Sequence, residues 1–181
     1  MRRYLLSFLL VFFLLGSYPV ARVRPLVPTR PVHTPPGLQF LANRAGLIFA
    51  GTVLSVERIP ATQPNQIETV DVRFRVEQPV RGVNSGQTVG IREWGGLWVG
   101  RPRYQVGQRL LVFLYPPSKL GLTSPVTGIG NFAVDRHGWL RPSPTQQQML
   151  EESGLLSRVP IRGRRIAVTD FARTLRRVRL E

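Results

Sequence analysis

The hydrophobic pattern of the chain is centred on the run from Ala45 to Val56, where most positions are apolar. Both side-chain parities of this run are largely apolar, which predicts a strand buried on both faces. Gly51, near the middle, predicts a bulge or bend, because a residue without a side chain leaves the backbone unobstructed. The alternative, a segment of buried helix, is disfavoured by the β-branched content and by the strand-like runs downstream.

The clearest period-two alternation follows in residues 70–77 and predicts a strand with one face on a core and one in water. Charges of both signs alternate on the wet face, so we expect cross-strand ion pairs worth less than about 1 kcal/mol each. The inward positions are Val70, Val72, Phe74 and Val76, and the outward ones are Asp71, Arg73, Arg75 and Glu77.

Shorter runs predict the remaining strands. Residues 88–92 indicate a third strand, and residues 109–115 a nearly continuous apolar fourth strand that has to be covered on both sides. Residues 129–134 predict a fifth, after which a tight turn at 135–138 returns the chain. His137 lies at the tip of that turn, where turn chemistry explains it more simply than catalysis.

The C-terminal part is predicted to be helical. Ser143, Pro144 and Gln146 fit an N-cap, a first helical residue and the partner of a capping box, with Gly154 as the stop. Thr169 is a second start signal, and we expect the helix that follows to pack on the sheet with its arginines in water. Its apolar stripe is Phe171, Leu175 and Val178, with Arg173, Arg176, Arg177 and Arg179 mostly off it.

The N-terminal part has the pattern of an export signal and a tether. Arg2 and Arg3 precede the apolar run 4–15, which is too short to span a bilayer and indicates a signal peptide. An uncleaved anchor is the alternative. Residues 22–37 are rich in proline and arginine, which is typical of an extended linker, and His33 within it is a poor ligand candidate.

Composition narrows the function further. The chain has no cysteine, which excludes disulfides, thiolate metal sites and cysteine nucleophiles. Its net charge of +15 suggests anionic partners. However, 24 of the 25 basic residues are arginine, with Lys119 alone, a skew that a GC-rich genome produces without any ligand. We therefore do not take the charge as evidence for nucleic-acid binding.

No catalytic constellation is visible in the sequence. Ten acidic residues and two distant histidines supply no nucleophile with a base and no set of three metal ligands, so we expect neither an enzyme nor a cofactor. The segment 94–104 is the candidate interaction surface, because tryptophan, tyrosine and arginine are enriched where partners bind. Its alternative role is to plug the end of a barrel with one or both tryptophans. The candidate residues are Trp94, Trp98, Arg101, Arg103 and Tyr104.

Three motifs together resemble the superfamily of netrin domains and tissue inhibitors of metalloproteinases, and in particular its cysteine-free bacterial secreted members. They are Ile48–Val53, then Val72–Glu77 followed by Val80–Gly82, and Val106–Phe113. The resemblance implies a five-stranded Greek-key barrel of the OB type with helices against it. In the animal inhibitors an N-terminal cysteine reaches the protease zinc, so that inhibitory mechanism does not carry over to this chain.

We therefore expect a mainly β protein with C-terminal helices, an OB-like (TIMP-like) barrel, in the periplasm or secreted. Its expected function is a non-catalytic protein-interaction module with another extracytoplasmic protein as partner; the alternative is a binder of anionic envelope polymers or nucleic acid. The expected parts are a signal peptide (1–21), a linker (22–38), the barrel (39–141) and a helical extension packed on it (142–181). The predicted core includes Phe49, Val53, Val72, Phe74, Val76, Leu111, Phe113 and Phe132.

Overall fold

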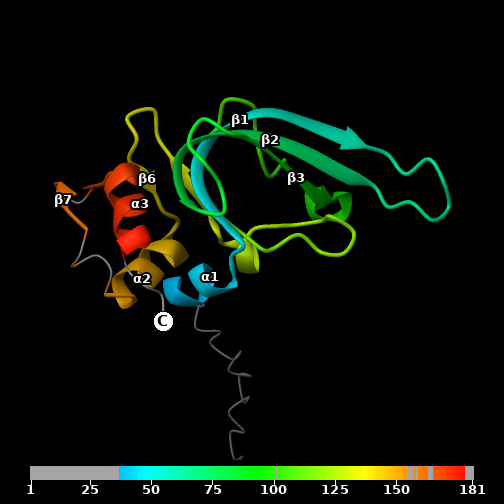
Figure 1. Cartoon of the computed structure of the whole chain (residues 1–181). Coiled ribbons are helices and arrows are strands. Elements are labelled where there is room, and N and C mark those ends of the chain that lie inside the picture. Colours follow the sequence, from blue (N-terminus) through cyan, green and yellow to red (C-terminus); the bar gives the residue numbers. More distant parts are fainter. Residues whose placement is uncertain (1–36, 101, 155–156, 158, 163–164, 178–181) are drawn as a thin grey trace, which may run out of the picture. The chain divides into compact units, whose positions relative to one another are not determined.

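The structure is a computed structural model, and it describes residues 37–177 except 101, 155–156, 158 and 163–164. The predicted signal peptide and most of the linker with His33 lie outside the described residues, as do Arg101, Val178 and Arg179. The elements, seen in Figure 1, are α1 (Leu38–Arg44), β1 (Leu47–Ile59), β2 (Thr69–Arg81), β3 (Thr88–Trp94), the 3-10 helix η1 (Gly95–Trp98), β4 (Arg109–Leu114), the 3-10 turn η2 (Val126–Gly128), β5 (Asn131–Val134), β6 (Leu140–Arg141), α2 (Pro144–Glu152), β7 (Ile161–Arg162), β8 (Arg165–Ile166) and α3 (Val168–Arg177).

The described residues form a mainly β protein, as predicted. Six strands make one antiparallel sheet in the order β3-β2-β1-β4-β5-β6. Because β4 returns to lie beside β1, strands β1 to β4 form a Greek key. The run that dominates the sequence pattern is β1, which pairs with β2 on one side and with β4 on the other.

Three register shifts bend the long β1–β2 ladder. They lie between Ile48 and Phe49, between Ala50 and Gly51, and between Val53 and Ser55. The shift between Ala50 and Gly51 confirms the bulge or bend predicted at this glycine. A Cβ atom on Gly51 would collide with the carbonyl oxygen of Arg75, so only glycine fits there without a shift of the strands. Beyond the bulges the β1–β2 loop projects away from the helices (Figure 1).

Hydrogen-bonded ladders do not close the described sheet, since none joins β3 to β6. Two isolated bridges nevertheless link β3 to β4 through the segment 122–125: Arg92 pairs with Leu122 in parallel sense, and Leu114 pairs with Pro125 in antiparallel sense. One bridge is parallel and the other antiparallel because β3 and β4 run in opposite directions on the two sides of this segment. The predicted five-stranded barrel remains a prediction.

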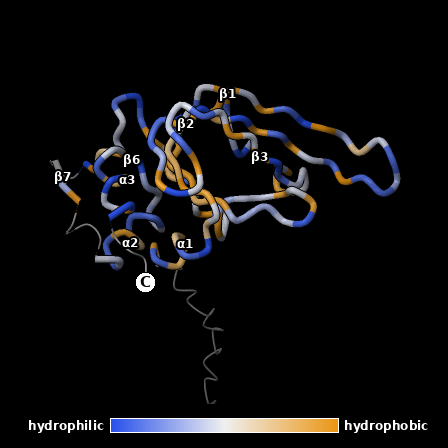
Figure 2. Tube along the Cα trace, in the orientation of Figure 1, coloured by the Kyte–Doolittle hydropathy of each residue, from blue (hydrophilic) through white to orange (hydrophobic). Residues whose placement is uncertain are grey.

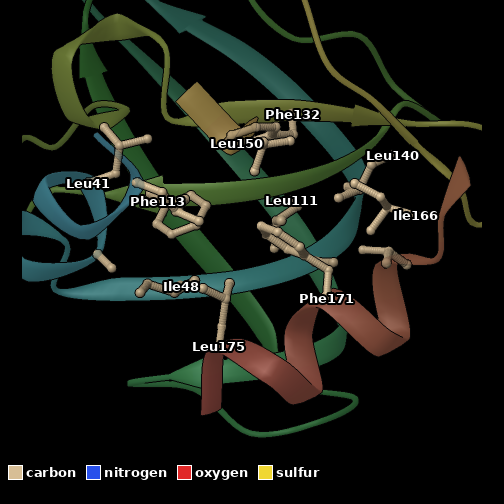
Figure 3. Packing of buried hydrophobic residues seen from close by; sticks show 14 of the residues in the cluster. Leu41, Ile48, Leu111, Phe113, Phe132, Leu140, Leu150, Ile166, Phe171 and Leu175 are labelled. Carbon is tan, nitrogen blue, oxygen red and sulfur yellow. The ribbon is translucent and has the colours of Figure 1, made fainter. Parts of the chain in front are cut away.

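The sheet has an inner face and an outer face, each with its own core. The inner core gathers side chains from β1 to β4, such as Phe49 and Phe74, together with Trp98 and Tyr104. The outer core packs α1, α2 and α3 on one half of the sheet through residues such as Phe171 of α3 (Figure 3). All eight predicted core residues are buried. Figure 2 shows the alternation of hydrophilic and hydrophobic positions along β1 and β2.

The predicted helix starts are correct for α2 and wrong by a residue or two for α3. Ser143 caps α2, and its reciprocal bonds with Gln146 complete the expected capping box. Helix α3 begins at Val168, before Thr169, and the Phe171 N–H already donates to the Ala167 carbonyl at 3.0 Å. The reason is that Ala167 is held in a β-bridge with Trp139, so the helix starts directly after it.

Candidate binding surfaces

The loop 94–104, predicted as the interaction surface, is divided between core and solvent. Trp94 is 52% exposed, whereas Trp98 is 7% exposed and Tyr104 is buried. Arg103 is mostly buried. Three of the five predicted residues therefore lie in or near the inner core, one faces solvent, and Arg101 lies outside the described residues. The burial of Trp98 and Tyr104 corresponds to the alternative role, in which the loop plugs one end of the sheet.

The buried residues of the loop are gathered around Glu93, which sequence reasoning missed. Glu93 is fully buried at the end of β3. Its carboxylate accepts hydrogen bonds from the Trp98 Nε1–H and the Tyr104 hydroxyl, both at 3.0 Å. The Arg103 Nε atom lies 3.1 Å from the same carboxylate as an ion pair, although its N–H does not point closely enough at the oxygen to form a hydrogen bond.

Burial dominates the electrostatics of this cluster. It raises the pKa of Glu93 above the usual carboxyl value, and the opposing effects of Arg103, Tyr104 and Trp98 do not cancel it. Burial also raises the pKa of the Tyr104 hydroxyl, with the Glu93 carboxylate adding to the effect. Both oxygens of Glu93 already have donors from the loop, so we assign this carboxylate to anchoring the loop.

A chain of aromatic rings ties the same loop to the centre of the inner core. Ring centroids are 5.7 Å apart for Trp98 and Tyr104, 5.5 Å for Tyr104 and Phe74, and 5.6 Å for Phe74 and Phe49. The contacts of Phe74 with Tyr104 and with Phe49 are edge-to-face and the contact of Trp98 with Tyr104 is tilted, and such ring pairs stabilise beyond the burial of their area. Beside the loop lies a pocket of about 520 Å³, lined by Val56, Arg58, Val70, Trp98, Gly100, Pro102 and Tyr104.

The outer face of the sheet is covered by helices over one half only. On β1 the covered half carries Ile48 and Ala50, which belong to the outer core. The cover ends at Thr52, whose hydroxyl donates to Glu77 at 2.5 Å. Glu77 also accepts hydrogen bonds from Arg109 of β4, at 2.5 and 3.2 Å. Beyond this polar boundary the outer face of β1, β2 and β3 has no helix over it in the described part of the chain.

The far end of the uncovered half carries exposed apolar side chains, which we call the apolar tip: Ile59, Ile67, Trp94 and Leu120. Ile59 and Trp94 both lie opposite Thr69 in the ladders, so these three side chains form one row across the sheet. A groove of about 370 Å³ opens there, lined by Ile59, Pro60, Asn65, Gln66, Ile67, Thr69, Arg92, Leu120 and Leu122. Leu120 is 74% exposed at its rim.

Between the boundary and the apolar tip, charged side chains follow β2. Asp71 accepts two hydrogen bonds from Arg92, at 2.6 and 2.7 Å, which confirms a predicted cross-strand ion pair. This hydrogen bonding lowers the pKa of Asp71. Arg73 and Arg75 are exposed, and no ion pair within the described residues joins either of them to a carboxylate. We call these two residues the arginine pair.

The described residues offer no metal site and no membrane helix. No group of three acidic or histidine side chains in them could hold a metal ion. None of their helices has the length and apolar character needed to cross a bilayer. His137 is exposed in the turn, and its backbone N–H donates to Asp135 at 2.9 Å.

Two signals in the sequence could have located what was missed. Glu93 continues the inward parity of Val89 and Ile91 on β3, so period-two reasoning extended by one more residue places a carboxylate inside the core. Ile67 and Leu120 are apolar residues isolated in polar loops, and only the fold brings them to one groove.

Comparisons of this chain with protein-family models, with curated proteins and with solved structures gave no match. The function is therefore argued from the surfaces described above.

Proposed function

We propose that this protein is a non-catalytic, extracytoplasmic interaction module of the TIMP-like kind that binds another protein through the apolar tip. The observation that carries the proposal is the gathering of Ile59, Ile67 and Leu120 around one groove on a sheet face without helical cover in the described residues. The exposed Trp94 lies beside the groove, opposite Thr69 of its lining. Contiguous exposed apolar groups on an otherwise polar surface mark interaction sites. The tip is preferred to the pocket beside Trp98, because the aromatic side chains lining that pocket are already used by the inner core.

The OB-like barrel belongs to the same proposal. The bridges of segment 122–125 to β3 and β4 support it, since that segment occupies the place that a closing fifth strand would take. The signal-like leader Arg2–Leu15 supports export of the chain. Intact-mass measurement of the protein from its native host tests export: loss of the leader is expected, and a mass that includes Met1 to Ser17 contradicts cleavage.

Capture from the envelope fraction tests the interaction. The full chain is immobilised, and retained proteins are identified by mass spectrometry for the unaltered protein and for the double variant Ile67→Ser with Leu120→Ser. We expect the variant to lose a specific partner without a change in melting temperature. Val106→Ser is the matched control, because Val106 is also exposed, at 68%, but does not line the groove. Equal capture by all three proteins contradicts the proposal.

Trp94 and Trp98 separate the surface from the core within the predicted loop. Trp94→Ala is expected to weaken capture and leave the melting temperature nearly unchanged, since this ring is half exposed. Trp98→Ala is expected to lower the melting temperature, because it removes a core ring and a donor to Glu93. A large fall in melting temperature for Trp94→Ala removes that residue from the proposed surface.

A second candidate function is the binding of an anionic polymer, which the arginine pair favours. Salt distinguishes the two functions, because binding to phosphate-type polymers weakens steeply as salt rises whereas apolar contacts persist. Capture that depends on Ile67 and Leu120 and persists in part at high salt supports the protein partner, and capture that ignores these two residues and is lost at high salt supports the polymer.

A further inference from the structure

The arginine pair lies on the same strand face as the apolar tip. From the boundary outward, the outer positions of β2 are Arg75, Arg73, Asp71 and Thr69, and Thr69 belongs to the row of the apolar tip. We propose that the partner docks through an extended acidic segment, with two carboxylates on the arginine pair and an apolar side chain in the groove of the tip. This inference rests on the proposed function and names the chemistry of its partner.

The surroundings of the arginine pair favour carboxylates. Arg73 lies opposite Ser55 on β1 and Gly90 on β3. Arg75 lies opposite Thr52 on β1 and Thr88 on β3. On both neighbouring strands the residues opposite the two arginines are therefore glycine or short hydroxyl residues, which let a ligand backbone approach. The exposed Leu54, between Thr52 and Ser55 on β1, adds an apolar side chain beside them. Arginine is suited to this role, because its planar fork of donors matches a carboxylate in two-point contact.

The spacing favours an extended segment. Positions two apart on a strand are about 7 Å apart, which is also the spacing of same-side residues in an extended peptide. Two acidic residues separated by one residue therefore match the arginine pair. The distance along β2 from Arg73 to the row that contains Thr69 is about 13 Å. The apolar residue of the ligand therefore belongs four positions beyond the acidic residue that contacts Arg73.

The charges between the two contacts add a restriction. Asp71 is occupied by Arg92, and Glu57, which lies opposite Asp71 on β1, is exposed. A third acidic residue of the ligand would face Glu57 across this row, so a neutral or basic residue is required there. Over seven consecutive residues, the ligand therefore needs acidic residues at the first and third positions, a neutral or basic residue at the fifth and an apolar residue at the seventh. The second, fourth and sixth positions are unrestricted. A uniform polyanion does not satisfy this pattern, which is why the observations favour an acidic peptide.

Defined peptides test the inference with the full chain. The probe is a short fluorescein-labelled peptide with aspartate at its second and fourth positions, lysine at the sixth, leucine at the eighth, and serine or threonine elsewhere. Binding is followed by fluorescence polarisation. The rearranged form of the probe has the same composition but carries leucine between the two aspartates, and it is expected to bind about tenfold more weakly. A second peptide, in which aspartate replaces the lysine, is also expected to bind about tenfold more weakly.

Protein variants locate the contacts. The double variant Arg73→Gln with Arg75→Gln is expected to bind the probe at least about tenfold more weakly, and the tip variant Ile67→Ser with Leu120→Ser about tenfold more weakly. Arg136→Gln with Arg177→Gln removes the same charge from exposed positions elsewhere and should change binding less than about twofold.

Several results would overturn the inference. The inference is wrong if the probe does not bind, or if the probe and its rearranged form bind equally well. It is also wrong if the two arginine double variants weaken binding of the probe equally. An oligo-thymidylate strand that binds as well as the probe, and whose binding ignores the tip variant, would show that the arginine pair takes polyanions instead. If the probe fails while capture of a protein partner still depends on Ile67 and Leu120, the proposed function stands and only this inference falls.

Discussion

The two halves of the outer sheet face differ in composition although β1 runs through both. In the covered half, β1 and β4 present Ile48, Ala50, Leu111 and Phe113 to the helices. In the uncovered half, the strands carry arginines, carboxylates and small polar residues up to the apolar tip. The contrast shows that helical cover ends where the strand pattern stops being apolar on both faces, as expected if burial of apolar area holds the helices in place.

The boundary between the halves is a single polar cluster. Glu77 joins Thr52 of β1 and Arg109 of β4, and Arg109 also donates to the Asp135 carbonyl at 3.4 Å. Burial raises the pKa of Glu77, but the hydrogen bonds from Thr52 and Arg109 outweigh it and leave that pKa below its usual value. A charge satisfied in this way can stand at the edge of an apolar core, where an unpaired one would be costly.

Among substitutions on the outer face, the largest expected effect on stability lies in the covered half. Phe113→Ala removes a fully buried ring that packs 5.9 Å from Phe132, centroid to centroid. Such a change costs about 3–5 kcal/mol of unfolding free energy, through lost burial and the cavity left behind. Chemical denaturation measures it. A cost below about 1 kcal/mol would mean that the helices do not depend on this half of the sheet.

The next effect lies at the bend between the halves. Gly51→Ala is expected to destabilise the protein by about 1–3 kcal/mol, because the added methyl group meets the backbone of Arg75 and strands β1 and β2 must shift. Gly90→Ala is the control: a Cβ there has nothing within 4 Å, so a small stabilisation of under about 1 kcal/mol is expected. Equal losses of unfolding free energy from Gly51→Ala and Gly90→Ala would mean that the bend does not depend on Gly51.

A smaller effect should depend on pH in the uncovered half. The pKa of Asp71 is lowered in the folded state, so its contribution to stability is present at neutral pH and disappears as the pH falls below about 4. Asp71→Asn should therefore cost less than about 1 kcal/mol at neutral pH and progressively less as the pH falls below about 4 and through the lowered pKa of Asp71. Arg92→Gln, which removes the partner, should give the same profile in urea titrations. A constant difference across this range contradicts the ion pair.

The smallest effect belongs to the arginine pair itself. Arg73→Ala should change the unfolding free energy by less than about 0.5 kcal/mol, because the side chain is exposed and forms no ion pair with a carboxylate in the described part of the chain. Its neighbour Phe74 points to the inner core, so Phe74→Ala should cost about 3–5 kcal/mol. If the two substitutions had equal effects, the inward and outward faces of β2 would be assigned wrongly.

Sequence periodicity predicted the strands and the faces they bury, but it did not predict which loops meet beside them. Alternation placed Phe74 inward and Arg73 outward, and the capping residues placed the start of α2, because these features depend on neighbours close in the chain. The joining of Leu120 to Ile67 depends on a contact between distant segments, which no local pattern encodes. The gathering of Trp98, Arg103 and Tyr104 at Glu93 depends on how the loop folds back on the end of β3, although the parity of β3 already points Glu93 inward. The density of tryptophan, tyrosine and arginine marks the loop 94–104 in the sequence, but it does not decide how the two tryptophans divide between core and solvent.

The position of β1 between β2 and β4 has a consequence for how the chain folds. Strands β1, β2 and β3 are connected by successive hairpins, so they can pair before the rest of the chain is available. The apolar outer positions of β1, by contrast, stay bare until β4 and the C-terminal helices have been synthesised. Pairings between such distant segments are slow to form because a long loop has to close first. Chains that end before β4 should therefore aggregate, and the last third of the sequence controls whether the first third becomes soluble.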